Sequence, residues 1–211
     1  MTDKHLDAVV KATVKLPCMG GQGVLVGGGL ILTAAHCLDY DSTTGVQITL
    51  GDQPLIEVET ADGLNFMLTP WVIESVSDIA LLGPPDNQSY GEDVEKLEDF
   101  CFKTKAVPIF RGVLIGASVP IMIRSHKQRW INGTVEQHGL SSHRVGIRAD
   151  EQVEGGTSGG PIVTKEGHLV GIVSQSSETG GPCIGVTPRP HLALPSWAAK
   201  LIYKRRFEGH F

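Results

Sequence analysis

Three short motifs in this chain of 211 residues carry side chains that could act together as a nucleophilic catalyst. The motif TAAHC contains His36, the motif SDIALL contains Asp78, and the glycine-rich motif GGTSGGP contains Ser158. A serine hydroxyl is almost fully protonated at neutral pH. It attacks a carbonyl only when a histidine takes its proton and a carboxylate holds that imidazole in the right tautomer. The three motifs supply one residue for each of these roles.

The glycines that flank Ser158 suit a further requirement of acyl transfer. The transition state places negative charge on an oxygen, and preorganised backbone N–H groups stabilise that charge. Because glycine has no side chain, a glycine-rich loop can turn its amides outward and let a substrate backbone approach closely. We assign this oxyanion hole to the backbone N–H groups of Gly156 and Ser158.

Each motif alone has a plainer interpretation, because a serine among glycines is usually part of a turn. A lone histidine or aspartate beside a strand is usually a packing or capping residue. The combination is more specific. His36 and Asp78 lie in one half of the chain and Ser158 in the other, in the order histidine, aspartate, serine. This order favours the catalytic interpretation.

The segments that must position these residues have the pattern of short strands. Apolar runs recur at intervals of about ten residues and are separated by Gly, Pro and Asn, which is typical of a barrel or sandwich. Alternating strands and helices would give a different pattern. We expect strands in residues 8–16, 23–33, 46–50, 71–76, 79–82, 113–115, 119–123, 130–137, 144–148, 161–163, 168–174 and 183–186.

One polar and acidic segment, residues 83–105, interrupts the strands and divides the chain into two halves. Its prolines and polar residues indicate a linker, with a short helical turn at residues 94–100. Near the C-terminus, residues 195–207 have apolar side chains at helical spacing, which predicts an amphipathic helix. The predicted organisation is a first barrel in residues 1–83, a linker in 84–105, a second barrel in 106–194 and a C-terminal helix in 195–211.

Composition and charge exclude several classes of function. Apolar residues make up 41% of the chain and charged residues 19%, as in ordinary globular proteins, and the net charge of −5 gives nucleic acid no general attraction. No apolar run reaches the roughly 18 residues that span a membrane. No histidine or cysteine pair has metal-ligand spacing, so we predict no metal and no cofactor. The N-terminus shows no secretion signal, so we expect a cytoplasmic protein, or a secreted one if a leader was removed.

Together the motifs TAAHC, SDIALL and GTSGGPIV, with the stretch GIVS at residues 171–174, resemble the chymotrypsin/trypsin family of serine peptidases. The likeness runs through nearly the whole chain in order and spacing. It is closer to bacterial trypsin-like and HtrA-type members than to secreted digestive zymogens. The resemblance implies an all-β fold of two antiparallel six-stranded β-barrels with a C-terminal α-helix, and an active site between the barrels.

The resemblance also implies a role for each site residue in a serine endopeptidase that hydrolyses peptide bonds of a protein or peptide substrate. His36 would act as general base and then general acid, Asp78 would orient it, and Ser158 would form the acyl-enzyme. The residues expected to bind the substrate are Gln152, Val153, Ser174, Gln175 and Ser176.

Two departures from the family pattern concern activation and cysteines. Secreted members carry an aspartate just before the catalytic serine, which pairs with the N-terminus released by zymogen cleavage, whereas this chain has Thr157. The oxyanion loop must then be held in another way, either constitutively or by a protein activator or regulator. Relatives also bond the cysteine after the histidine to one on the preceding strand, where this chain has Val26. We expect free thiols, although a bridge from Cys37 to Cys18 stays open.

The base of the specificity pocket leaves two preferences open. Trypsin itself selects Arg or Lys with an acid six residues before the serine, and this chain has Gln152 there, followed by Val153. That sequence favours a small or apolar substrate residue over a basic one. A shift of one or two positions would instead bring a carboxylate into the pocket. The candidate carboxylates are those of Asp150, Glu151, Glu154 and Glu178.

Proteins of other classes are weaker alternatives. The stretch GTSGG also satisfies the G-x-S-x-G nucleophile elbow of α/β-hydrolases. That fold needs alternating helices and an acid followed by a histidine after the serine, and no aspartate follows Ser158. A non-catalytic homologue that acts as a binding module is disfavoured, because such proteins usually lack a triad residue. A protease that is silent until a partner activates it keeps the same chemistry and stays open.

Overall fold

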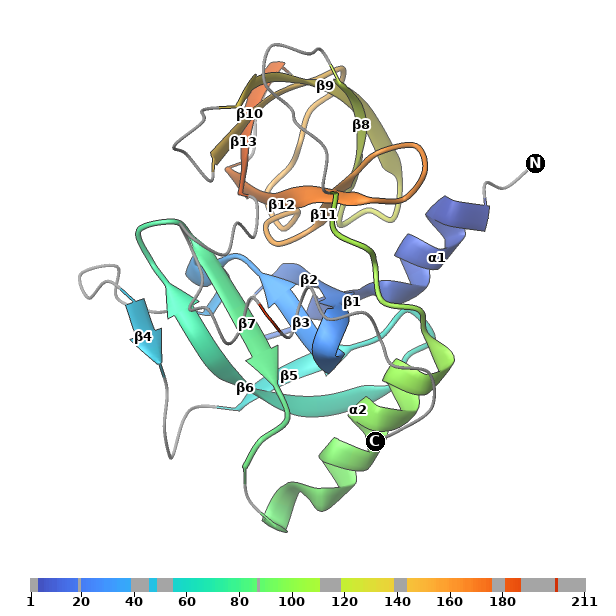
Figure 1. The fold of residues 1–211 in the computed structure, drawn as a ribbon, viewed down its shortest axis with the longest axis vertical. Helices are drawn as coiled ribbons and strands as arrows, with labels where there is room; N and C mark the ends of the chain where they lie inside the picture. Colours follow the sequence, from blue (N-terminus) through green and yellow to red (C-terminus); the bar gives the residue numbers. More distant parts are fainter. Residues whose placement is uncertain are drawn as a thin grey trace.

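The computed structural model describes residues 4–18, 20–38, 46–48, 55–86, 88–110, 119–138, 144–175, 181–186 and 200. These residues form two β-barrels that lie one above the other in Figure 1. A short helix lies at the side where the two barrels meet, and a longer helix packs against the lower barrel.

The first barrel is antiparallel throughout and uses strands β1 to β7. Their order is β4-β6-β5-β1-β2-β3-β7, and an additional pairing of β6 with β7 closes a ring of six strands, with β4 attached to β6. The elements are β1 (Thr13–Leu16), β2 (Gly21–Val26), the 3₁₀ turn η1 (Gly27–Gly29), β3 (Leu30–Thr33), the 3₁₀ turn η2 (Ala35–Leu38), β4 (Val46–Ile48), β5 (Ile56–Glu59), β6 (Asn65–Glu74), β7 (Ile79–Gly83) and the 3₁₀ turn η3 (Gln88–Tyr90).

The second barrel is a closed ring of six antiparallel strands in the order β10-β13-β12-β11-β8-β9. Its strands are β8 (Val119–Arg124), β9 (Trp130–His138), β10 (Arg144–Ala149), β11 (Pro161–Val163), β12 (Leu169–Gln175) and β13 (Gly181–Val186). The predicted pair of six-stranded antiparallel barrels is therefore confirmed.

Side-chain burial explains why these segments form strands. Along β5 and β6, buried residues such as Val58, Phe66 and Leu68 alternate with more exposed ones, which is the period of a strand with one face in the core. Strands β2, β3 and β7 are buried along their whole length, so they appear in the sequence as nearly continuous apolar runs.

The prediction of one strand over residues 8–16 is wrong in its first half. Residues Lys4–Ala12 form helix α1, and β1 begins at Thr13. Val9 and Ala12 are both buried, which gives an apolar side chain on every third residue and so a helical face. The consecutive β-branched residues Val9 and Val10 suggested a strand, but packing of this face against the first barrel decides the conformation.

Strand β5 and the first half of β6 are absent from the sequence-based prediction. Strand β5 carries Glu57 and Glu59 among its four residues, and Pro70 lies inside β6, where a proline normally argues against a strand. The register with β7 shifts between Pro70 and Val72, so the proline lies at a bulge of the ladder. The bulge removes the need for a regular backbone donor at that position.

Residues 84–105, predicted as a linker with one helical turn, contain a full helix, α2 (Gly91–Lys103). Its buried face carries Leu97 and Phe100, three residues apart. Phe100 packs on Phe66 of β6 with the ring centroids 6.0 Å apart. The many acidic side chains of this segment lie mainly on the solvent face, which is why the sequence resembles a linker.

Two other predicted elements fall on parts of the chain that the structure does not describe. The C-terminal helix of residues 195–211 lies outside the described residues except for Lys200, and the strand expected at residues 113–115 lies outside them as well. Neither α1 nor α2, the α-helices in the described part of the chain, has the length and apolar character needed to cross a bilayer.

The segment that follows α2, residues 104–110, crosses from the first barrel to the second and is called the crossing segment below. The N–H of Val107 donates to the carbonyl of Leu25 on β2, at 2.9 Å. The N–H of Phe110 donates to the carbonyl of Leu169 on β12, at 2.8 Å, and the N–H of Leu169 donates to the carbonyl of Pro108, at 2.7 Å. The chain is therefore fixed to both barrels where it passes between them.

Candidate active site

Asp78 lies in the turn between β6 and β7 and has an unusual backbone conformation, with φ of 58°. The turn is held by the carboxylate of Glu74, the last residue of β6, which is only 4% exposed. That carboxylate accepts hydrogen bonds from the N–H groups of Val76, at 3.2 Å, and Ser77, at 2.6 Å. The N–H of Asp78 donates to the carbonyl of Ser75 at 3.3 Å. The aspartate is thus presented by a turn with fixed backbone donors.

His36 lies in η2, directly after strand β3, and faces this aspartate. Its Nδ1 is 3.0 Å from Oδ1 and 2.9 Å from Oδ2 of Asp78, and its backbone N–H donates to Oδ1 at 2.9 Å. The carboxylate therefore fixes both the backbone and the ring of the histidine. With Nδ1 occupied by the carboxylate, Nε2 is the ring nitrogen left to serve a reacting group.

Ser174, predicted to bind substrate, also has a contact with Asp78. Its hydroxyl donates to Oδ2 at 2.5 Å, from strand β12 of the second barrel. This hydrogen bond joins the aspartate of one barrel to a strand of the other. Gln175 is exposed, and Ser176 lies outside the described residues, so a role of these two in substrate binding stays a prediction.

The charges of the pair are mutually stabilising. The hydrogen bond that His36 donates to the Asp78 carboxylate holds the pKa of His36 well above its ordinary value, and a contact with the neighbouring Cys37 acts in the same direction. Burial alone would raise the pKa of Asp78, but the hydrogen bonds from His36 and Ser174 outweigh burial, and the net pKa is lowered. The site therefore favours an ionised carboxylate beside an imidazole that readily accepts a proton.

Ser158 lies in a loop between two glycines with left-handed backbones, Gly156 with φ of 84° and Gly159 with φ of 76°. The carbonyl of Ser158 accepts from the N–H of Gln22 on β2, at 2.8 Å. The N–H of Gly159 donates to the carbonyl of Val173 on β12, at 2.8 Å. A Cβ added to Gly159 would lie 2.0 Å from the carbonyl oxygen of Gln22. Glycine is required at 159 because backbone fills the space a side chain would need.

The residues before Ser158 form a tight turn. The N–H of Thr157 donates to the carbonyl of Glu154 at 3.2 Å, and Gly156, the third residue, has φ of 84° while Gly155 lies outside the left-handed region. These values define a type II turn, which needs glycine at its third position. In this turn the plane of the Gly155–Gly156 peptide sets the direction of the Gly156 N–H.

The structure brings the three predicted residues of the triad into one region. Gly159, next to Ser158, is bonded to Val173, and the following residue, Ser174, is bonded to Asp78. A second connection runs through Gly21, where an added Cβ would lie 2.5 Å from Sγ of Cys37 and 3.3 Å from the carbonyl oxygen of Ser158. The side chain of Cys37, the residue after His36, and the backbone carbonyl of Ser158 thus meet at one glycine.

Cys18 and Cys37 are not joined by a disulfide bond. Cys37 is buried beside Gly21, and Cys18 is exposed, with its thiol 3.5 Å from Oε2 of Glu57. The expected free thiols are therefore observed at these two positions.

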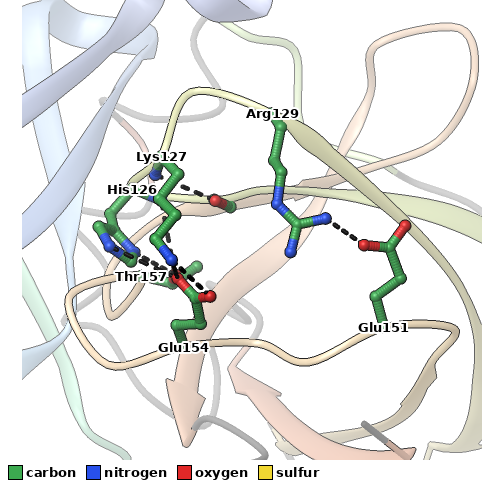
Figure 2. Close-up of polar contacts among 7 residues, drawn as sticks. His126, Lys127, Arg129, Glu151, Glu154 and Thr157 are labelled. Atoms are coloured by element: carbon green, nitrogen blue, oxygen red, sulfur yellow. Dashed lines mark hydrogen bonds and ion pairs between the residues drawn. The ribbon is translucent and has the colours of Figure 1, made fainter.

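The residues around the predicted pocket base differ in exposure. Gln152 is exposed and Val153 is fully buried. Figure 2 shows Glu151 paired with Arg129 across the surface. It also shows Glu154, which bonds to Nζ of Lys127 at 2.7 Å. Among the described residues no group of His, Cys, Asp or Glu side chains has the arrangement of a metal site.

Two residues of this site have no motif in the sequence. Glu74 holds the turn of Asp78, and His126 contacts the turn that precedes Ser158. His126 lies in no recognisable motif and is far from Ser158 in the chain. The fold brings it close through the connection between β8 and β9, which no local pattern reveals.

Two closed antiparallel barrels, with a histidine–aspartate pair on one and a glycine-flanked serine on the other, define a chymotrypsin-like protease fold. Residues 21–172 match the trypsin-like peptidase domain, and the chain belongs to this family of serine proteases. A relative from Arabidopsis thaliana, Protease Do-like 2, chloroplastic, is 26% identical over 156 residues, which are 74% of this chain and 23% of the relative. The chain thus spans about a quarter of that relative's length.

Solved structures of a Mycobacterium tuberculosis protease share the fold. The inactive Ser343Ala mutant of Rv3671c from strain H37Rv aligns with a TM-score of 0.61 and 16% identity, over 95% of this chain and 91% of that one. The active form of the Rv3671c protease aligns with a TM-score of 0.59 and 15% identity, over 96% of this chain and 86% of that one. At such identities the likeness establishes the double barrel alone.

Proposed function

We propose that this protein is a serine endopeptidase with His36, Asp78 and Ser158 as its catalytic triad and the backbone N–H groups of Gly156 and Ser158 as its oxyanion hole. The observation that carries the proposal is the hydrogen-bonded path from the Ser158 loop through Ser174 of β12 to Asp78 and His36. This path uses groups of both barrels, and it supports the assignment of Ser158 as nucleophile and His36 as its base.

In the proposed reaction, Nε2 of His36 takes the proton of the Ser158 hydroxyl as its oxygen attacks the scissile carbonyl carbon. Asp78 keeps a proton on Nδ1 and stabilises the imidazolium that forms. When the C–N bond breaks, Nε2 gives its proton to the leaving amine. Water then loses a proton to Nε2 and attacks the acyl-enzyme, the carboxylic acid product leaves, and Ser158 regains its proton.

For substrates we propose proteins or peptides with a small or apolar residue on the acyl side of the scissile bond. Two of the carboxylates near the pocket base are already engaged, Glu151 by Arg129 and Glu154 by Lys127. Gln152 carries no charge. These contacts favour the small or apolar preference over the basic one, because a basic side chain would need an unpaired carboxylate in its pocket.

The test of the proposed function is labelling of the purified protein by a fluorophosphonate probe, which reacts only with an activated serine. We expect the wild type to label and Ser158→Ala to remain unlabelled. Ser89→Ala, in η3 on the linker side of the first barrel, is the matched control and should label at the wild-type rate. A folded wild-type protein that does not label would contradict the proposal.

A further inference from the structure

His126 lies in the connection between β8 and β9 and contacts both ends of the turn that precedes Ser158 (Figure 2). Its Nδ1 is 3.3 Å and its backbone nitrogen 3.5 Å from Oγ1 of Thr157, the last residue of that turn. Its Nε2 is 3.7 Å from Oε2 of Glu154, the first residue. One imidazole therefore bridges the ends of the turn that contains Gly156.

One hydrogen-bond arrangement gives every polar atom of this contact a partner. The Thr157 side chain is fully buried, so its hydroxyl needs partners within the protein. In the tautomer that carries its proton on Nε2, the Thr157 hydroxyl accepts from the His126 backbone N–H and donates to Nδ1, while Nε2–H faces the carboxylate of Glu154. We assign this tautomer because it leaves none of these groups without a partner.

The ring also packs against Gly156 itself. A Cβ added to Gly156 would lie 3.5 Å from Cγ and 3.7 Å from Cδ2 of His126, so the imidazole lies within van der Waals reach of the face of the glycine where a side chain would stand. A change of this turn from type II to type I would rotate the Gly155–Gly156 peptide by about 180° and reverse the Gly156 N–H. Glycine permits both conformations, so another group must select one.

From these contacts we propose that His126 is a positioning residue: it bridges Glu154 and Thr157, keeps the turn in the type II form and so directs the Gly156 N–H toward the developing oxyanion. The inference rests on the proposed function for its catalytic consequence. The position before Ser158 is a threonine, which cannot form the ion pair that an aspartate would. Instead of that ion pair, the hydrogen bond between the buried Thr157 hydroxyl and the His126 imidazole holds the loop.

The experiment compares three variants by the maximal rate and the half-saturating concentration of fluorophosphonate labelling. His126→Ala should lower the maximal rate by about 10²–10³-fold, the effect of losing one oxyanion donor, with little change in the half-saturating concentration. His126→Asn, whose amide can replace Nδ1, should recover at least about tenfold of that loss. Lys103→Ala removes an exposed ion pair with Asp99 on α2, outside the site, and should stay within about twofold of wild type.

Crystal structures of the wild type and of His126→Ala give a readout that does not depend on activity. We expect a type II turn with a left-handed Gly156 in the wild type and a reversed Gly155–Gly156 peptide in the variant. A His126→Ala protein that keeps the type II turn and labels within about threefold of wild type would overturn the proposal. If the wild type does not label at all, the proposed function fails, and the turn in the two structures still decides whether His126 positions it. Should His126→Ala not fold, the His126→Asn structure and rate carry the same decision.

Discussion

At the scale of single residues, Asp78 combines a left-handed backbone with a central place in the site. A φ of 58° is uncommon for residues other than glycine, and Asp and Asn tolerate it best because their short polar side chains bond locally. Such conformations cost about 1–3 kcal/mol and persist where the surroundings enforce them. Here the Glu74 carboxylate fixes the turn, while His36 and Ser174 bind the Asp78 side chain.

Asp78→Asn keeps the shape and the tolerance for this backbone but removes the charge, so we expect it to fold and to label about 10⁴-fold more slowly. The pH dependence should change as well. Asp78 raises the pKa of His36, and His36 must be neutral to accept the serine proton. Without the carboxylate the pKa falls, so the rising limb of the labelling rate moves to lower pH. Labelling rates measured from about pH 5 to 9 check both effects, and a limb that does not move would contradict the role given to Asp78.

At the scale of elements, the β6–β7 turn depends on a buried carboxylate that no motif identifies. Glu74→Gln leaves one acceptor oxygen for the two N–H groups of Val76 and Ser77, and the second donor would face an amide NH₂. We expect a loss of about 1–3 kcal/mol in the free energy of unfolding and slower labelling. Urea unfolding and labelling measure these changes.

The matched control for this prediction is Glu57→Gln on the neighbouring strand β5. Glu57 is partly exposed, and its carboxylate accepts a weak hydrogen bond from the thiol of Cys18. This variant should change the free energy of unfolding by less than about 0.5 kcal/mol. Equal losses in the two variants would show that Glu74 has no special place in the turn.

The same elements show what sequence can and cannot predict. The barrels were predicted because their strands are short, apolar and separated by turn residues, and the triad candidates because each lies in a short motif. Helix α1 and strand β5 were missed because β-branched or polar residues obscure their periods. Glu74 and His126 were missed because their partners are chosen by the packing of segments that are distant in the chain.

At the scale of the whole molecule, the Ser174 hydroxyl joins the two barrels at the site. Ser174→Ala removes a charge-assisted hydrogen bond to the Asp78 carboxylate, which is worth about 1.5–3 kcal/mol when it is partly buried. We expect labelling to slow by about tenfold or more. Ser174→Thr keeps the hydroxyl and should stay closer to wild type. If the alanine and threonine variants label equally fast, the link between the barrels does not support the triad.

The crossing segment has a consequence for how such a site can be switched. Val107 is bonded to the first barrel and Phe110 to the second, and three residues of chain reach about 10 Å at most when fully extended. So short a connection allows little movement of one barrel relative to the other. A movement of the barrels that separated Ser158 from His36 would first have to break the backbone hydrogen bonds at Leu25 or Leu169. Reversible control of the proposed protease is therefore expected to come from the rotation of one peptide plane, a movement that preserves the shape of the molecule.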